Sequence, residues 1–452
     1  MKRLLMIFPL LISCVIGLSQ EQKPNIIFIF ADDWGYGDLG CHGSTFCKTP
    51  VLDKMVDEGI DFQNFSVANP VCSPSRTAVM TGQFPSKYNI HGHFSSIKTN
   101  KKREMPDWLN PKAPMLTRMM KKAGYVTGHF GKWHLTNSAI SDAPLPYQYG
   151  IDEYGAFNIS GKQMDVEQTI PMTLDFIKQH QSHPFYINVW IHAAHTPHYP
   201  KNKYLDEFSY LDEQKKVYAS VITDADKQIG NIFSLLKELG IDKNTLVVFS
   251  SDNGPEKTTK RRKINDASTG PGLGSFYSVG ETGGLKGRKR SLYAGGVRVP
   301  FIVRWPGKVP AGIRNNTTSI TAVDLLPTFI ELAGATPPKN YHGDGQSIVT
   351  ALKGNPFERT KTIYWEWRLW KDNSPNWPNL GIQEGKWKLL INTDLKRSEL
   401  YCIQDDWAEQ KEMSKEYPKV VQTLLNKALV WKMKLPKKSE IPQSCISTER
   451  MK

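Results

Sequence analysis

The sequence predicts an α/β protein in which a large, mostly parallel sheet lies between helices, followed by a small C-terminal domain with a short antiparallel sheet and one helix. Continuous apolar runs, such as NIIFIF at 25–30, are typical of parallel strands that are covered on both faces. Helical stretches separate these runs, which favours strands joined by crossover helices. The chain has 452 residues, more than one hydrophobic core usually serves, so we expect a second, smaller unit.

The larger domain is expected to span residues 24–350, because strand and helix patterns alternate along it. Proline and glycine mark the ends of its helices, as in the stretch PVLDKMVDEG. Strands are expected at 25–30, 125–129, 185–190, 245–250 and 301–305, and helices at 50–58, after Pro74, and at 115–122, 173–180, 211–239 and 322–333.

The small C-terminal domain is expected at 356–452, after a stretch rich in glycine and proline at 336–345. Short aromatic strands and one helix replace the alternating pattern there. The strands are expected at 362–367, 386–391 and 399–401, and the helix at 418–433. A segment at 257–284, rich in glycine, serine, threonine and basic residues, is expected to form a long surface loop beside the site.

The first 20 residues predict a secretory signal peptide, because a basic start precedes an apolar run and small residues. Cleavage is expected near Ser19 or Gln20. The stretch LISC also resembles a lipoprotein box, which would make Cys14 a lipid anchor, although the apolar run continues past Cys14. We therefore expect an exported protein, periplasmic or secreted, with a surface lipoprotein as the alternative.

Composition and charge narrow the class of partner. The hydrophobic content of 39% and the charged content of 23% are those of an ordinary globular protein. The net charge of +14 favours a polyanionic partner, such as nucleic acid, an anionic membrane, or a sulfated or phosphorylated substrate. The basic residues are scattered and no known nucleic-acid-binding motif occurs, so no nucleic-acid partner is expected.

The cysteines leave one residue that needs a separate explanation. Export would permit disulfides, and Cys41 with Cys47, or Cys402 with Cys445, are candidate pairs that the sequence cannot assign. If all four were paired, Cys72 would be left over. It lies among small polar residues in VCSPSRTAVMTG, where a helix is about to begin. It is a thiol, half of a disulfide, or a group made from a thiol.

Oxygen-bearing side chains follow two of the expected strands. Asp32 and Asp33 come directly after the strand at 25–30, and Asp252 and Asn253 follow the strand at 245–250. The carboxyl ends of strands form the ligand crevice of an open parallel sheet, so these side chains are expected to converge. Hard oxygen donors favour calcium or magnesium over zinc. The alternative is that both pairs are ordinary turn residues.

Six motifs carry a family resemblance. They are IIFIFADDWGYGDLG, CSPSRTAVMTG, GHFGKWH, HTPHYP, SDNG and GGVRVP, and they occur in this order between about residues 24 and 350. With them, the chain resembles the type I, formylglycine-dependent sulfatases of the alkaline phosphatase superfamily. The resemblance implies an alkaline-phosphatase-like sandwich, and the small C-terminal domain also fits the family plan.

The resemblance implies a role for Cys72. In the family, a formylglycine-generating enzyme oxidises this cysteine to formylglycine (3-oxoalanine), and the aldehyde hydrate is the nucleophile. Arg76 would hydrogen-bond the hydrate as it gains negative charge. Pro74 suits the first turn of the following helix, whose N-terminal dipole favours an anion near residue 72.

One calcium ion is implied as well. Its ligands would come from the two strand ends, with the formylglycine at residue 72 completing the set. Carried over from the motifs, the side-chain ligands are Asp32, Asp33, Asp252 and Asn253.

The remaining catalytic groups also come from the motifs. Lys132 matches the lysine that contacts sulfate, and His134 matches the histidine that contacts the formylglycine and acts as a base. His195 matches the histidine that binds sulfate and helps to protonate the departing sugar oxygen. Lys289 matches the second sulfate-binding lysine; its block departs from the family pattern, so Lys286 is an alternative.

The sequence therefore predicts an exported sulfatase that hydrolyses sulfate monoesters on a sulfated carbohydrate, in a polysaccharide-degrading bacterium. An algal polysaccharide such as ulvan or carrageenan, or its oligosaccharides, is the first expectation for the substrate, and a glycosaminoglycan the second. One rival is a non-catalytic protein that binds sulfated glycans and whose Cys72 is never converted. A phosphoester hydrolase of the same superfamily is the other, but such enzymes use Ser or Thr as nucleophile and commonly two zinc ions.

Three further sets of side chains have two interpretations each. Zinc could be bound by His192, His195 and His198, but two prolines prevent a regular helix there. The sugar pocket could be lined by His91 and His93, which otherwise lie in loops. A carbohydrate platform could be formed by Trp365, Trp367, Arg368 and Trp370, which otherwise pack in the core.

Overall fold

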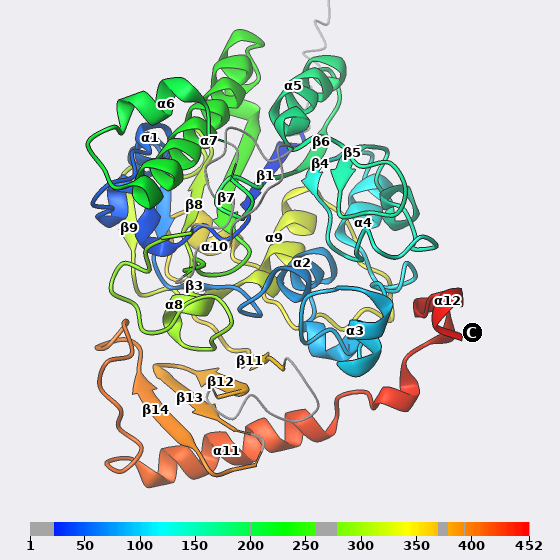
Figure 1. The fold of residues 1–452 in the computed structure, drawn as a ribbon, viewed down its shortest axis with the longest axis vertical. Coiled ribbons are helices and arrows are strands. Elements are labelled where there is room, and N and C mark those ends of the chain that lie inside the picture. The colour runs from blue at the N-terminus through cyan, green and yellow to red at the C-terminus, as the bar shows by residue number, and fades with distance from the viewer. Residues whose placement is uncertain (1–21, 199, 259–277, 369–377, 393, 452) are drawn as a thin grey trace, which may run out of the picture.

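The computed structural model describes residues 22–198, 200–258, 278–368, 378–392 and 394–451. A large unit surrounds one sheet, and a small sheet with a long helix lies beside it at the C-terminal end (Figure 1). The expected signal peptide with Cys14, most of the loop expected at 257–284, and Trp370 lie outside the described residues.

The large sheet has eight strands in the order β5-β4-β6-β1-β7-β8-β2-β9. All neighbours are parallel except β8, which runs antiparallel to both β7 and β2. The mostly parallel sheet expected from the sequence is confirmed. The strands are β1 Asn25–Ala31, β2 Ile60–Phe62, β4 Val126–Lys132, β5 Glu153–Phe157, β6 Phe185–Trp190, β7 Thr245–Ser251, β8 Phe301–Arg304 and β9 Ile313–Asn315; β3 Phe65–Ser66 and β10 Ile320–Thr321 pair separately.

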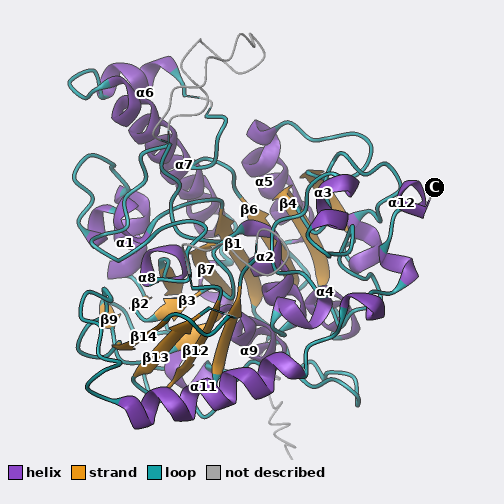
Figure 2. Ribbon diagram, turned by 60° about the horizontal axis from the view of Figure 1, so that its bottom comes forward, coloured by secondary structure: helices purple, strands orange, loops and turns teal. Residues whose placement is uncertain are grey.

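Helices cover both faces of this sheet (Figure 2). One face of β1 packs with apolar residues of α1, α5 and α7, and the other with those of α2, α4 and α9. The central strands are buried on both faces, which explains why they read as continuous apolar runs. The helices are α1 Pro50–Asp57, α2 Cys72–Thr81, α3 Ile97–Lys102, α4 Leu116–Lys122, α5 Thr169–His180, α6 Asn202–Glu207, α7 Glu213–Glu238, α8 Ala294–Val297, α9 Leu325–Leu332, α10 Val349–Leu352, α11 Pro418–Met433 and α12 Thr448–Met451.

The C-terminal sheet is antiparallel, in the order β11-β12-β13-β14. Helix α11 packs on one of its faces, where Leu424 and Ala428 meet the apolar side chains of β12 and β13. The helix occupies the residues expected from the sequence, whereas β12 was not expected. The strands are β11 Ile363–Glu366, β12 Leu380–Glu384, β13 Trp387–Ile391 and β14 Ser398–Cys402.

The structure corrects one expectation from the sequence in detail and answers one question that the sequence left open. Helix α2 begins at Cys72 rather than after Pro74, so Pro74 lies in the first turn, where its missing N–H costs no helical hydrogen bond. The candidate disulfides are not formed: all five cysteines of the described chain are free thiols, namely Cys41, Cys47, Cys72, Cys402 and Cys445. Among the described residues, none of the helices has the length and apolar character needed to cross a membrane.

Candidate active site

The candidate site lies at the carboxyl ends of adjacent strands of the large sheet. Ala31, the last residue of β1, pairs with Ser251, the last residue of β7. The next residues, Asp32 and Asp252, therefore leave the sheet side by side, and the Asp252 N–H donates to the Ala31 carbonyl at 2.9 Å. The convergence expected from the two strand ends is confirmed.

Asp33 and Asn253 complete this group of oxygen donors. The Asn253 side-chain amide donates to Asp33 Oδ1 at 2.7 Å, and the Asp33 N–H donates to Asp252 Oδ1 at 3.2 Å. Asp33 has a left-handed backbone, with φ of 62°, a conformation that aspartate tolerates better than most residues. The other atom of the amide, Asn253 Oδ1, is buried and has no hydrogen-bond partner.

Cys72 faces this group from the first residue of α2. Its sulfur lies 3.5 Å from Asp32 Oδ1 and 3.4 Å from Lys132 Nζ. Burial raises the pKa of the Cys72 thiol above its usual value, and the Asp252 carboxylate raises it further. As an unmodified cysteine the residue is therefore protonated at neutral pH and is a poor nucleophile.

Arg76 is one helical turn after Cys72 and is fully buried. Its Nη2 and Nε donate to Asp252 Oδ2 at 2.6 and 3.1 Å, and its Nη1 donates to the Lys132 carbonyl at 2.9 Å. The guanidinium also lies 4.8 Å from the centroid of the Trp190 ring. These contacts hold a permanent positive charge beside Asp252, one helical turn after residue 72.

Two lysines neutralise the aspartates that follow β1. Lys132, the last residue of β4, donates to Asp32 Oδ2 at 2.6 Å, and Lys289 donates to Asp33 Oδ2 at 2.5 Å. Burial alone would lower the pKa of each lysine, but the neighbouring carboxylate raises it above its usual value. The alternative lysine, Lys286, turns away and donates to the Tyr401 hydroxyl at 2.7 Å.

Both expected histidines belong to segments that leave the large sheet at this edge, after β6 and β4. His195 Nε2 is 3.8 Å from Asp33 Oδ2, and potential ligand atoms of Asp32, Asp33, Cys72 and His195 all lie within 4.8 Å of one another. His134 Nε2 lies 3.1 Å from the Phe94 carbonyl, while its Nδ1 is buried without a partner. Burial lowers the pKa of both rings well below the usual value, so each is neutral at pH 7.

The site also contains a residue that the sequence singled out for another reason. His192, two residues after β6, places its Nδ1 3.1 Å from Asp32 Oδ2. Its position after a strand at the same edge of the sheet is the signal that could have identified it. His198 instead packs against the Tyr218 ring at 5.7 Å, so the three histidines do not form the zinc set considered above.

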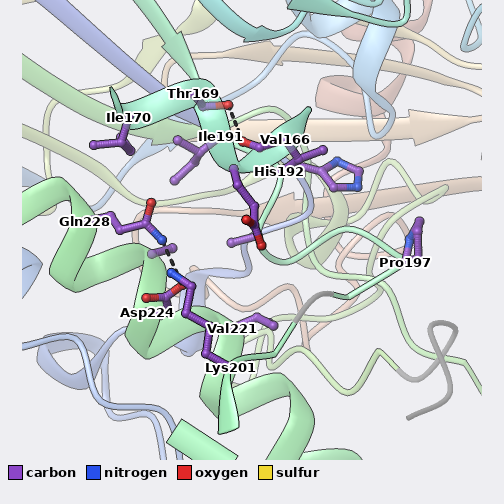
Figure 3. Close-up of a pocket in the computed structure, with 13 residues that line it drawn as sticks. Val166, Thr169, Ile170, Ile191, His192, Pro197, Lys201, Val221, Asp224 and Gln228 are labelled. Atoms are coloured by element: carbon purple, nitrogen blue, oxygen red, sulfur yellow. Dashed lines mark hydrogen bonds and ion pairs between the residues drawn. The ribbon is translucent and has the colours of Figure 1, made fainter. Parts of the chain in front are cut away.

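The pocket in Figure 3 lies beside the segment that carries His192, and both His192 and Pro197 belong to its lining. Its cavity volume is about 80 Å³, and its wall is mainly apolar and includes Ile170 and Ile191. At its edge, Lys201 pairs with Asp224 at 2.7 Å. This pocket brings together none of the carboxylates of the site.

The remaining candidates are mostly structural. His91 is buried, with Nε2 2.9 Å from the Arg103 carbonyl and Nδ1 3.2 Å from Arg368 Nη2, whereas the His93 ring lies 6.5 Å from that of His134. The two tryptophans of the expected carbohydrate platform are 1% exposed and belong to the core. These two are Trp365 and Trp367.

The oxygen donors fit a hard divalent cation. Burial raises the pKa of Asp33 and of Asp252, the latter to about 7, and the neighbouring Asp32 carboxylate adds to both shifts. A cation between the carboxylates would remove this repulsion. The unpartnered Asn253 Oδ1 is the kind of neutral oxygen that calcium coordinates.

Comparisons with known proteins find similarity to sulfatases along most of the chain. A family model described as Sulfatase matches residues 24–335, and one described as N-sulphoglucosamine sulphohydrolase, C-terminal, matches residues 280–434. The N-acetylgalactosamine-6-sulfatase of Homo sapiens is 32% identical to this chain over 388 residues, which cover 76% of this chain and 68% of the human protein. The N-acetylgalactosamine-6-O-sulfatase of Bacteroides thetaiotaomicron is 25% identical and covers 94% of this chain, with 98% of its own length matched.

A solved structure extends the similarity to three dimensions. The crystal structure of Ps i-CgsB in complex with k-i-k-neocarrahexaose is 27% identical in sequence, with a TM-score of 0.76. The superposition covers 92% of this chain and 94% of the other.

Proposed function

The chain belongs to the sulfatase family, and from this premise we propose that it is an exported enzyme that removes sulfate from sulfated carbohydrates. A sulfuric ester hydrolase needs a nucleophile for sulfur and fixed positive charge for the sulfate oxygens. The observation that carries the assignment is the position of residue 72, whose Sγ lies 3.4 Å from Lys132 Nζ and 3.5 Å from Asp32 Oδ1.

In this proposal Cys72 is converted to formylglycine by a formylglycine-generating enzyme. The hydrate of this aldehyde would supply two hydroxyl groups on one carbon. One would attack sulfur as the bond from sulfur to the sugar oxygen breaks. Loss of the proton of the other would expel sulfate by breaking the bond from carbon to the sulfate oxygen, and water would then hydrate the aldehyde again. The buried, protonated thiol described above could not supply this second oxygen. Arg76, held by Asp252, places its positive charge where the hydrate gains negative charge.

The proposed metal is one calcium ion, held by residue 72 and by the side-chain oxygens at the ends of β1 and β7. A calcium ion in this position would draw charge from a sulfate oxygen and stabilise the deprotonated nucleophile. The unpartnered Asn253 Oδ1 and the crowded carboxylates support this assignment. The ligands are Asp32, Asp33, Asp252 and Asn253.

The proposed binding of sulfate relies on the two buried lysines. Lys132 and Lys289 are already ordered by Asp32 and Asp33, so they need little rearrangement when the ester binds. His195, next to Asp33, is the proposed donor of a proton to the departing sugar oxygen, a role that requires the negative charge of the bound sulfate to raise the pKa of its ring. His134, with a neutral ring and an unpartnered Nδ1, is the proposed base that restores the aldehyde.

The substrate class is proposed from the relatives. One similar structure binds a neocarrahexaose, and curated relatives act on sulfated N-acetylgalactosamine. We place an oligosaccharide of an algal polysaccharide such as carrageenan first and a glycosaminoglycan second. Export rests on the signal peptide at 1–20, with the lipid anchor at Cys14 as the alternative; the mass of the mature N-terminus distinguishes the two.

The function is tested by sulfate release from protein made together with a converting enzyme. Sulfated oligosaccharides of carrageenan, ulvan and chondroitin are offered with 4-nitrocatechol sulfate as a small ester. The proposal expects sulfate release from the small ester and from at least one class of oligosaccharide. Binding of the oligosaccharides without any sulfate release from converted protein would instead favour the non-catalytic glycan binder.

A further inference from the structure

A second concave surface lies on the same edge of the large sheet as the candidate active site, three strands away from β1. It is a pocket of about 350 Å³ between the end of β2 and the segment after β14, and it shares no residue with the site described above. We call it the β2-edge pocket. It is lined by Tyr36, Cys41, His42, Gln63, Arg298, Asn316, Ile403, Gln404 and Trp407.

One wall of the β2-edge pocket is an exposed and well-supported aromatic ring. Trp407 is 41% exposed, although a tryptophan in a soluble protein is usually well covered. Its ring meets that of Tyr36 edge to face, with the centroids 5.6 Å apart. Tyr36 in turn stacks on His42 at 4.0 Å with an interplanar angle of 6°. The stack holds Trp407 in place, so its free face can receive a flat apolar surface at little cost in entropy.

Another wall contains a buried cation, Arg298, for which the described part of the chain offers no ion pair. Arg298 is 7% exposed and lines the pocket, with its guanidinium 5.9 Å from the centroid of the Trp407 ring. Its side chain donates to the Asn64 amide oxygen at 2.9 Å, and within the described residues it forms no ion pair with a carboxylate. The Glu409 carboxylate raises the pKa of Arg298, but it accepts its hydrogen bonds from Lys388 and from the Ala294 N–H.

Burial lowers the pKa of Arg298, which shows that the protein environment disfavours its charge. A buried guanidinium without a carboxylate is costly unless an anion completes its hydrogen bonds. The other lining groups include the side-chain amides of Gln63, Asn316 and Gln404, which can donate to and accept from hydroxyl groups. A rigid aromatic face, planar amides and a cation in need of an anion are complementary to a sugar that carries a negative substituent.

We propose that the β2-edge pocket is a second saccharide-binding site, in which Trp407 stacks on a sugar ring and Arg298 binds a sulfate or carboxylate group of that sugar. The identity of the glycan as the substrate class rests on the proposed function above. Among the described residues that line the pocket, Cys41 is the one thiol, and burial raises its pKa, so it is a poor nucleophile. None of these lining residues carries a carboxylate, and the proposed role of the pocket is therefore binding without turnover.

The position of the pocket gives it a consequence for long substrates. Strand β2 runs parallel to β7, with β8 between them, so the ends of β1 and β2 open at the same edge. At about 4.8 Å between neighbouring strands, those ends are roughly 14 Å apart. A chain of several sugars can reach both sites, and the second contact then acts at a high effective concentration. Short esters reach only the active site.

The test compares Trp407→Ala with Tyr417→Ala as a matched control. Tyr417, which directly precedes α11, is a similarly exposed aromatic residue, at 39%. Its ring packs against that of Trp387 on β13. Binding is measured by calorimetry on full-length protein made without a converting enzyme, because its thiol at residue 72 allows no turnover. The probes are ι-carrageenan hexasaccharide, chondroitin 6-sulfate hexasaccharide, the desulfated carrageenan hexasaccharide and sodium sulfate.

The proposal expects Trp407→Ala to weaken the binding of a sulfated hexasaccharide at least tenfold, with Tyr417→Ala within twofold of wild type. Arg298→Lys keeps the positive charge but loses the planar fork, and is expected to reduce the preference for sulfated over desulfated hexasaccharide. In converted enzyme, the loss of kcat/KM in Trp407→Ala should grow with the number of sugars and stay below twofold for 4-nitrocatechol sulfate.

Equal hexasaccharide binding by wild type and by a folded Trp407→Ala variant would overturn the inference. So would a loss of kcat/KM that is the same for short and long substrates, because that result indicates distortion of the active site. Binding of none of the hexasaccharides by wild type would overturn both this inference and the proposed substrate class, whereas hydrolysis of 4-nitrocatechol sulfate in that case would leave the enzyme class intact.

Discussion

Buried charge is arranged in opposite ways in the C-terminal sheet and at the strand ends of the large sheet. In the C-terminal part, Lys388 on β13 donates to Glu409 at 2.6 Å and to the Leu292 carbonyl at 2.9 Å, and Glu409 also accepts from the Ala294 N–H at 2.7 Å. Glu366 on β11 pairs with Lys432 of α11, and the pKa of this carboxyl falls to about 2, although burial alone would raise it.

At the strand ends the carboxylates crowd one another. Burial raises the pKa of Asp252 to about 7, the Asp32 charge adds to this, and the Arg76 charge compensates only in part. Asn253 Oδ1 is left without a partner. The carboxylates of both regions are buried, so burial alone does not explain the difference.

The difference separates charge that holds the structure together from charge that awaits a ligand. A buried pair with all of its hydrogen bonds made fixes one arrangement of the chain. Lys388 donates to the Leu292 carbonyl, and Glu409 accepts from the Ala294 N–H. Because these backbone groups come shortly after Lys289, the pair connects the C-terminal sheet to the active-site segment. A crowded set with an unpartnered oxygen is costly by itself and is typical of a functional site.

The largest expected effect is the loss of activity when the nucleophile is removed. Cys72→Ala should lower kcat by at least about 10⁴-fold, because no other group can replace the attacking oxygen. Cys445→Ala is the control, since Cys445 is also buried, at 2% exposure, in a separate apolar cluster. Steady-state kinetics on 4-nitrocatechol sulfate measures both; comparable activity of Cys72→Ala and wild type would contradict the assignment.

The second largest expected effect is the loss of stability when the buried pair of Lys388 and Glu409 is broken. Lys388→Met leaves the Glu409 carboxylate buried and unpaired, which should lower the free energy of unfolding by about 3–5 kcal/mol. The double variant Lys388→Met/Glu409→Gln should recover much of this loss. As a control, the exposed pair of Lys427 and Glu384 lies at 2.5 Å, and Lys427→Met should cost less than about 1 kcal/mol. Urea unfolding gives all three values; equal losses for the two single variants would contradict the contrast.

The crowded set should gain stability from a cation. Calcium at about 100 times its dissociation constant should add about 2.7 kcal/mol to the free energy of unfolding, and a chelator should reverse it. Asn253→Ala removes the unpartnered oxygen and should weaken calcium binding, as measured by calorimetry on unconverted protein. A melting temperature that is the same with calcium and with chelator would show that the carboxylates do not form a cation site.

The smallest expected effect is the acid dependence of the C-terminal sheet. The pKa of Glu366 is about 2 in the folded chain, below its usual 4.5, so its stabilising contribution is complete above pH 4.5 and is lost as the pH falls towards 2. Between pH 6 and pH 4 this group alone should cost about 1 kcal/mol. Glu366→Gln should be less stable at pH 6 and should lack this part of the acid slope. Identical slopes for variant and wild type would contradict the assignment.

Much of the site could be predicted from the sequence because its residues follow apolar strands. The runs NIIFIF and TLVVFS identify β1 and β7, and parallel neighbours bring Asp32 and Asp252 together without knowledge of any other part of the fold. Only the family resemblance favoured Lys289 rather than Lys286 as the second sulfate-binding lysine. In the structure Lys286 is drawn towards Tyr401 of the C-terminal sheet, a contact between distant segments.

Other features depend on tertiary contacts that local patterns do not contain. Strand β12 has the sequence LGIQE, with a glycine and a glutamine, and it forms because β11 and β13 pair with it on either side. Trp365 has the aromatic character of a sugar platform, yet its ring N–H donates to the Val67 carbonyl at 2.8 Å inside the core. Trp407, which is exposed, carried no signal in the sequence.

The mass of the tryptic peptide that spans residues 55–76 shows whether residue 72 carries a thiol or an aldehyde. Trypsin cleaves after Lys54 and Arg76, so this peptide carries residue 72. In protein that hydrolyses sulfate esters, we expect the mass of the aldehyde or its hydrate in place of the thiol. An unmodified thiol in fully active protein would contradict this expectation, because the nucleophile would then be another group.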